Sequence, residues 1–313
     1  MQTTGESEVE CDVLVIGGGP AGLSAALQLG RSLRSVLVCD DGEPRNGPAA
    51  EAHGYLTRDG IPPEELRRLG REEVAGYGAE FRDAQVTGVT TAEDGFTSTL
   101  DTDETVTSRK VVLATGVTDV LPETDGFEEL WGNGVYHCPY CHGYEVRGEP
   151  LGVLVTAPEQ LEHTTLIYNL STDLVVFTDG HDVFDEESRS AFVERGIEIE
   201  DEPITALVGS DGGLERITLA DGREVARHAL FYGPPMRQHS ELAERLGLEI
   251  DQFGLVDTTR TDHGFGFTSV DGLFVAGDAA SGSPASIPSA VAEGHTVGAT
   301  VNMELSREDF EAG

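Results

Sequence analysis

The first 40 residues contain three apolar segments with two different periods. CDVLVIG (11–17) and SVLVCD (35–40) are short continuous apolar runs, whereas PAGLSAALQLGRSL (20–33) repeats its apolar positions every three to four residues. Short runs bounded by turn residues are typical of buried strands, and the longer period is typical of a helix. The pattern predicts a strand–helix–strand unit over residues 11–40.

Glycines separate the first predicted strand from the helix. Gly17, Gly19 and Gly22 form GxGxxG, which permits a tight turn, a close backbone approach to a pyrophosphate and close packing of helix on strand. The helix N-terminus would offer free N–H groups and a positive dipole end to the phosphates. Asp40 ends the second strand, where a carboxylate can accept ribose hydroxyls. We therefore predict a dinucleotide-binding unit.

Two later segments identify the dinucleotide through a resemblance. RKVVLATG (109–116) and GLFVAGDAASG (272–282) are apolar strands ending in turns, and SIPSAVAEGHTVGATVN (286–302) returns to helical periodicity. They could be ordinary parallel strands, but with the N-terminal unit they resemble the FAD-binding half of the flavoprotein disulfide reductases with two dinucleotide domains. In that family the Gly-Asp carboxylate holds the ribityl chain and the pyrophosphate, and the following helix points its N-terminus at the isoalloxazine.

The resemblance implies FAD as the cofactor and a set of binding residues. These are Gly17, Gly19, Pro20, Ala21, Gly22, Asp40, Asn46, His53, Val86, Ala114, Thr115, Gly116, Gly277, Asp278 and Ile287. His53 lies in AEAHGYLTRDG, which resembles the family's loop beside the flavin. A surface position is the alternative for this histidine.

The expected fold class is α/β, with two three-layer Rossmann-like domains and the second inserted in the first. The FAD-binding domain would comprise 1–118 and 234–313. The inserted domain would comprise 119–233, with strands at LGVLV (151–155) and DLVVFTD (173–179) and helices at PEQLEHTTLIYNL (158–170) and DEESRSAFVERG (185–196).

CPYCHGYE (138–145) opens this inserted segment and admits several chemistries. CxxCH could attach haem, form half of a zinc site or cycle between dithiol and disulfide. Haem attachment requires export, and the polar, acidic N-terminus lacks the features of a signal peptide. Zinc usually takes four ligands, and no second cluster follows Cys138, Cys141 and His142. A structural disulfide is disfavoured in the cytosol, where the chain is expected, so a redox-active pair is the favoured hypothesis.

The position of CxxC resembles that of the low-molecular-weight thioredoxin reductases, a class of pyridine nucleotide-disulfide oxidoreductase. The form Cys-x-x-Cys-His-Gly is similar to the small-molecule dithiol oxidases. The resemblance implies that Cys141 faces the flavin and Cys138 exchanges with the substrate. His142 would take the acid/base role of the family's aspartate, because imidazole titrates near neutral pH. A helix-terminal histidine bound to backbone is the alternative.

The inserted segment departs from the family where NADPH would bind. Thr156 to His163 contain no glycine at the expected turn, and Asp179 and Asp182 follow the next strand where a 2′-phosphate would require arginines. We therefore predict a degenerate NAD(P)H-binding domain.

Three functional hypotheses follow. An oxidase would take electrons from a small dithiol and pass them to oxygen. A reductase would take electrons from ferredoxin or another carrier and reduce a thioredoxin-like protein. A flavin-bearing redox sensor would show negligible turnover. The family resemblance also implies a homodimer.

The composition indicates the conditions in which the protein works more than the reaction that it performs. The chain has 20 basic and 57 acidic side chains, a net charge of −37, and Lys110 as its single lysine. Such a charge would repel nucleic acid and anionic membranes. An acidic face that serves a partner is one explanation; adaptation to high salt is the favoured one, because the acids are spread along the whole chain and salt screens their repulsion. Cys11 and Cys39 lie at predicted strands and are interpreted as small apolar fillers.

Overall fold

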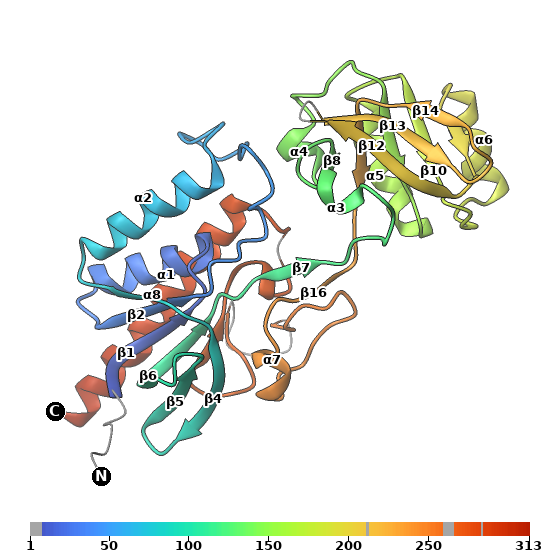
Figure 1. The fold of residues 1–313 in the computed structure, drawn as a ribbon. Coiled ribbons are helices and arrows are strands. Elements are labelled where there is room, and N and C mark those ends of the chain that lie inside the picture. Colours follow the sequence, from blue (N-terminus) through green and yellow to red (C-terminus); the bar gives the residue numbers. More distant parts are fainter. Residues whose placement is uncertain (1–7, 211–212, 259–265, 283) are drawn as a thin grey trace, which may run out of the picture. The chain divides into compact units, whose positions relative to one another are not determined.

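The chain divides into two compact units. The computed structural model describes residues 8–210, 213–258, 266–282 and 284–313; the N-terminal seven residues used in the signal-peptide argument lie outside this part. The first unit comprises residues up to Arg45 together with 64–119 and 236–313, and the second comprises 46–63 and 120–235 (Figure 1). Residues 46–63, assigned above to the FAD-binding domain, group by their contacts with the second unit.

The first unit is built from a parallel sheet, a hairpin and several helices. Its strands are β1 (Glu8–Ile16), β2 (Val36–Asp40), β3 (Glu80–Asp83), β4 (Val86–Ala92), β5 (Gly95–Leu100), β6 (Thr105–Leu113), β7 (Val117–Asp119), β16 (Met236–Gln238) and β17 (Leu273–Val275). Its helices are α1 (Pro20–Arg31), α2 (Pro63–Ala75), α7 (Leu242–Arg245) and α8 (Ile287–Ala312), with a 3₁₀ turn at Gly277–Ala279. The predicted strand–helix–strand unit is confirmed.

The main sheet of this unit has seven strands in the order β3-β2-β1-β6-β5-β4, and β17 also pairs with β6. Strands β1, β2, β3, β6 and β17 pair with one another in parallel, whereas β5 pairs antiparallel with both β4 and β6. The long strand β6 pairs with β5 through its first half and with β17 through its second half. The predicted strands from the two ends of the chain, β1 and β17, therefore both pair with β6 in one sheet.

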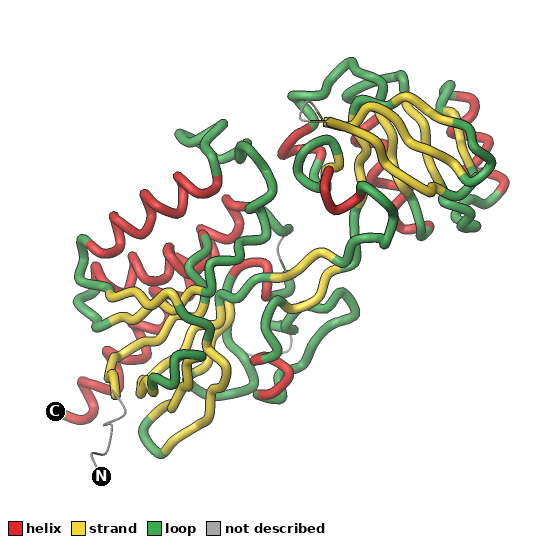
Figure 2. Tube along the Cα trace, in the orientation of Figure 1, coloured by secondary structure: helices red, strands yellow, loops and turns green. Residues whose placement is uncertain are grey.

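Alternate residues of β1 face opposite sides of this sheet, as the strand period requires. Val13 and Val15 pack in the core formed with α1 and α8, which lie along the same side in Figures 1 and 2. Leu14 and Ile16 pack in the core formed with the β4–β5 hairpin and α7. Both faces are buried, which explains why CDVLVIG is continuously apolar.

The second unit repeats the same plan on a smaller scale. Its strands are β8 (Val135–Tyr136), β9 (Leu151–Leu154), β10 (Leu174–Phe177), β11 (Glu198–Glu200), β12 (Ile204–Ser210), β13 (Gly213–Leu219), β14 (Glu224–Ala226) and β15 (Ala229–Tyr232). Its helices are α3 (Phe127–Leu130), α4 (Pro139–His142), α5 (Leu161–Tyr168) and α6 (Glu186–Glu194), with a 3₁₀ turn at Pro158–Gln160.

Five parallel strands in the order β11-β10-β9-β15-β8 form the central sheet of the second unit. One face packs in a core with the antiparallel sheet β12-β13-β14, and the other packs in a core that contains residues of α5. The α/β class with two three-layer Rossmann-like sheets is thus confirmed.

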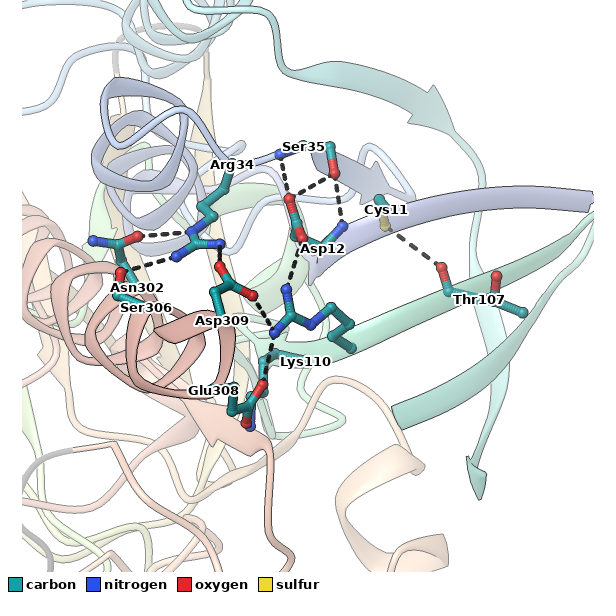
Figure 3. Close-up of polar contacts among 11 residues, drawn as sticks. Cys11, Asp12, Arg34, Ser35, Thr107, Lys110, Asn302, Ser306, Glu308 and Asp309 are labelled. Atoms are coloured by element: carbon teal, nitrogen blue, oxygen red, sulfur yellow. Dashed lines mark hydrogen bonds and ion pairs between the residues drawn. The ribbon is translucent and has the colours of Figure 1, made fainter. Parts of the chain in front are cut away.

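Ion pairs fasten the C-terminal half of α8 to the first sheet (Figure 3). Arg34 bonds Asn302, Ser306 and Asp309. Arg109 and Lys110, both on β6, pair with Glu308 at 2.9 and 2.6 Å. Because most of the positive charge here lies on the sheet side and most of the negative charge on the helix, the cluster opposes separation of the two.

No helix in the described ranges has the length and apolar character needed to cross a membrane.

Candidate active site

The two cysteines of CPYCHGYE form a disulfide at the start of α4, in the second unit. Cys138 is extended at the N-cap, Pro139 begins the helix, and the backbone N–H groups of Cys141 and His142 donate to the Cys138 carbonyl at 3.1 and 3.2 Å. This single turn brings the two Cα atoms to 5.2 Å. Both cysteine residues are partly exposed, so an external thiol can approach them.

Close packing explains why the residue after His142 is a glycine, Gly143. A Cβ at this position would lie 2.3 Å from the Pro139 carbonyl oxygen and 2.4 Å from Leu170 Cδ1. Any larger side chain would push the cysteine-bearing turn away from the unit.

His142 is half-buried behind the disulfide. Its ring stacks on Tyr136 with centroids 4.6 Å apart and an interplanar angle of 10°. Burial lowers its pKa, the charge of His53 lowers it further, and Glu145 and a hydrogen bond to the Glu51 backbone oppose these effects. The buried Nε2 atom has no hydrogen-bond partner among the described residues. An imidazole kept neutral with a free ring nitrogen is suited to accept a proton.

His53 lies beside His142. The two rings meet edge to face at 6.3 Å between centroids. His53 and Asn46 both belong to the second unit by their contacts, and their predicted contact with FAD stays a prediction.

The glycine loop of the first unit forms an open cradle. Gly17 has φ of 110°, and a Cβ there would lie 2.2 Å from the Ala114 carbonyl oxygen. A Cβ at Gly22 would lie 1.9 Å from the Gly17 carbonyl oxygen, so both positions require glycine. At Gly19, the N-cap of α1, an added Cβ would have no heavy atom within 4 Å. The loop is therefore tightly packed behind and open in front, which fits a pyrophosphate at the helix N-terminus.

Asp40 and Gly18 complete this cradle at the end of β2. A Cβ at Gly18 would meet the Asp40 carboxylate oxygen at 2.7 Å. Arg67 Nη1 lies 3.7 Å from the same carboxylate. A side chain at Gly18 would therefore force the Asp40 carboxylate to move, a constraint that the GxGxxG pattern does not include.

The remaining predicted FAD residues also lie in the first unit. They are Pro20 and Ala21 in α1, Val86 in β4, Ala114, Thr115 and Gly116 after β6, Gly277 and Asp278 after β17, and Ile287 at the start of α8. Their roles stay predictions, since the structure holds no ligand; the residues present fit FAD.

Arg45 was missed by the sequence analysis. Its guanidinium bonds Asp119, with the shortest contact at 2.6 Å, and Asp278 at 3.0 Å. Burial raises the pKa of Asp278, and Arg45 opposes this rise. Nothing in the sequence pairs a loop arginine with carboxylates 74 and 233 positions away.

Cys11 and Cys39 are free and buried, and burial raises the pKa of each thiol to about 12. Thiols this basic are inert at neutral pH, so their interpretation as apolar fillers is confirmed.

In the turn after β9, the side chain of Gln160 binds the backbone N–H groups of the turn. Gln160 Oε1 accepts hydrogen bonds from the N–H groups of Thr156 at 2.7 Å and Ala157 at 3.1 Å, and Gln160 Nε2 donates to the Gly233 carbonyl. Pro158 begins the 3₁₀ turn and has no N–H. In a nucleotide-binding Rossmann unit, N–H groups of this turn would bind the pyrophosphate.

The acids predicted at the next strand end lie where expected in the chain. Asp179 follows β10 with φ of 50° and accepts a hydrogen bond from the Ile204 N–H at 2.6 Å. Asp182 is exposed. The turn therefore presents acidic groups where a 2′-phosphate would need cations.

Two Rossmann-like units, one with a phosphate-binding glycine loop and one with a CxxC disulfide, define a disulfide oxidoreductase. Residues 11–294 match the model of the family described as pyridine nucleotide-disulphide oxidoreductase. The chain belongs to this family, as a thioredoxin reductase-like member.

Its similarity to individual proteins extends over nearly the whole chain. Thioredoxin reductase sirT of Leptosphaeria maculans is 36% identical, with 96% of each chain covered. The crystal structure of HlmI superposes with a TM-score of 0.88 at 37% identity, covering 100% of this chain and 96% of the other. A putative thioredoxin reductase TrxB of Bacillus anthracis gives 0.89 at 30% identity, covering 96% and 99%.

Proposed function

We propose that this protein is an FAD-dependent dithiol oxidase that does not use a pyridine nucleotide. A small dithiol would reduce the Cys138–Cys141 disulfide, and oxygen would be the final electron acceptor. The overall reaction converts a dithiol and O₂ into a disulfide and H₂O₂. The occupied turn of the second unit is the observation that carries this proposal.

Gln160 supports the absence of NAD(P)H for a physical reason. A pyrophosphate would have to displace the Gln160 amide from Thr156 and Ala157, leaving three good hydrogen bonds unmade, and Pro158 offers no donor in return. The acids Asp179 and Asp182 would repel a 2′-phosphate nearby.

The residues of CPYCHGYE would act in sequence. His142 takes the proton of one substrate thiol, and the resulting thiolate attacks Cys138 Sγ, breaking the disulfide and releasing the Cys141 thiolate. The second substrate thiol, after losing its proton, attacks the mixed disulfide, which releases the oxidised product and Cys138 as thiolate. When bound, FAD would supply a two-electron acceptor for the reduced cysteine pair and an outlet for electrons to oxygen.

A reductase, in which electrons flow in the opposite direction, is the second candidate function. The relatives named thioredoxin reductase favour a reductase that passes electrons outward to a thioredoxin-like protein. With the nucleotide turn occupied, such an enzyme would need ferredoxin or another reduced carrier as donor. The same cysteine pair would serve both directions, and relative reduction potentials would select between them.

Anaerobic bleaching of the yellow protein tests the proposal. One sample receives excess NADPH or NADH and a second receives a small dithiol, and air is then admitted to both. We expect bleaching by the dithiol alone, with colour and peroxide appearing in air. Rapid bleaching by NADPH would refute the proposal and indicate an ordinary thioredoxin reductase. Bleaching only by reduced ferredoxin would favour the second candidate.

A further inference from the structure

Residues 46–63, here called the strap, bring a second histidine to the redox site. The strap leaves the first unit after Arg45, packs on the second unit and returns at the start of α2. Its backbone at Pro48 and Ala49 lies so close to Gly132 that a Cβ there would come within 3.0 Å of it. The strap therefore belongs structurally to the disulfide-bearing unit.

One contact of the strap defines the tautomer of His142. The ring of His142 hydrogen-bonds the backbone of Glu51, while Nε2 has no partner among the described residues. The bonded nitrogen is therefore Nδ1, which donates its proton to the Glu51 carbonyl. In the neutral ring this leaves Nε2 with the lone pair. The strap thus orients His142 as a base.

A second contact of the strap places an imidazole and its carboxylate partners next to this base. His53 has three carboxylates around it: Nε2 lies 3.5 Å from Glu51 and 3.7 Å from Glu145, and Nδ1 lies 3.5 Å from Asp59. Its side chain is 15% exposed, and its other neighbour is the edge of His142. Within the described residues, no three metal-binding side chains form a cluster that could hold a metal ion.

We propose that His53 is a positioning residue that keeps the neighbouring His142 ring uncharged, with Nε2 free to take the proton of an incoming thiol. This role rests on the proposed function of His142. The three carboxylates would compensate the charge of His53, and Tyr136 and the disulfide, which also adjoin His142, carry none.

The arrangement predicts opposite effects from two neighbouring substitutions. The charge of His53 lowers the pKa of His142 and that of Glu145 raises it. His53→Gln should therefore raise the pKa of His142, and Glu145→Gln should lower it. A purely structural role for either residue gives no reason for opposite signs.

The test uses the FAD-loaded protein and two measurements. The first is the pKa of His142, from NMR titration of ¹⁵N-histidine-labelled protein, with the resonance assigned by its loss in His142→Gln. The second is the rate at which a small dithiol opens the Cys138–Cys141 disulfide, from pH 5 to 9, by anaerobic rapid quench with an alkylating agent and mass spectrometry. His181→Gln, an exposed histidine of the same unit, is the matched control.

We expect the pKa of His142 and the acid limb of the rate to move upward in His53→Gln. Both should move downward in Glu145→Gln and stay in place in His181→Gln. At pH 6 the His53→Gln rate should be several-fold below wild type, and at pH 8.5 the two rates should converge.

Shifts of the same sign in both variants, or no shift in either, would overturn the role of His53. Equal loss of rate at every pH would do so too, because that is the signature of a structural defect. A wild-type disulfide that no dithiol opens would instead refute the proposed function, and the two failures are thereby distinguished.

Discussion

At the scale of the residue, the cysteines of the disulfide have unequal positions. Cys138 is the extended N-cap of α4, and Cys141 lies inside the turn. Cys138→Ser should reduce dithiol turnover to the background rate while FAD stays bound, because the glycine loop predicted to bind FAD lies in the other unit. Turnover and the flavin-to-protein absorbance ratio measure the two effects. Cys39→Ala, which removes a free buried thiol, should retain turnover. Normal turnover in Cys138→Ser would exclude the dithiol mechanism.

We expect His142 to determine the pH dependence of disulfide opening. Burial lowers its pKa foremost, so the basic form persists to a more acidic pH than in an ordinary histidine, and the rate falls only as pH drops through this lowered value. His142→Ala should slow opening by about 10²-fold at pH 7. The deficit should shrink above pH ~8.5, where the substrate thiol ionises without help. Rapid-quench rates across pH measure this effect, and a deficit independent of pH would remove His142 from proton transfer.

Arg45 links Asp119 and Asp278 in the first unit, and its side chain is 18% exposed. Arg45→Ala leaves two largely buried carboxylates without their counter-charge, so we expect a loss of about 3–5 kcal/mol in unfolding free energy, together with weaker FAD retention. Thermal unfolding and the release of flavin fluorescence measure both. The control is Arg68→Ala, an exposed arginine paired with Glu65 and Glu72, where we expect a much smaller loss because water screens exposed ion pairs. Equal effects of the two substitutions would contradict this interpretation.

At the scale of the element, α8 depends on ionised carboxylates to stay on the sheet. Lys110 Nζ pairs with Glu308 at 2.6 Å (Figure 3). It also pairs with Glu304 at 3.2 Å. Burial raises the pKa of Glu308, but Lys110 and Arg109 outweigh it, and the net pKa lies below its ordinary value. A lowered carboxylate pKa contributes stability above the unfolded-state pKa, and this contribution is lost as pH falls through the folded-state value.

Lys110→Met should therefore destabilise the protein in a pH-dependent way. We expect a loss of about 1 kcal/mol at pH 7, or roughly 2–4 °C in Tm, since one partner is half-exposed. The difference from wild type should shrink as pH falls through the lowered pKa of Glu308. Calorimetry at several pH values measures it. A difference that is constant with pH would mean that packing of the lysine stem, and not its charge, stabilises α8.

At the scale of the whole molecule, the charge of −37 is spread over both units. Salt screens repulsion between exposed charges, so raising KCl from about 0.1 M to about 2 M should increase Tm even though it weakens individual ion pairs. A series at equal osmolality with a neutral solute separates screening from excluded-volume effects. A Tm that is unchanged or lower in KCl would contradict the hypothesis of adaptation to high salt.

Much of the fold could be predicted because its signals are local. The period of PAGLSAALQLGRSL and the run CDVLVIG correspond to α1 and β1, and LGVLV and DLVVFTD correspond to β9 and β10. A GxGxxG loop and a CxxC turn are likewise complete within a few residues. The contacts that were missed join distant positions: Arg45 with Asp278, Gln160 with Gly233, and the strap with α4.

The order of residues is therefore sufficient to specify two Rossmann-like units, a phosphate-binding glycine loop and a cysteine pair, because each follows from backbone period or short-range spacing. Long-range packing specifies which side chains surround the pair. It orients His142 through the Glu51 carbonyl, brings His53 to its edge, and fills the second nucleotide turn with Gln160. These features depend on contacts between segments that are far apart in the sequence. The hydrophobic period of the sequence does not reveal such contacts.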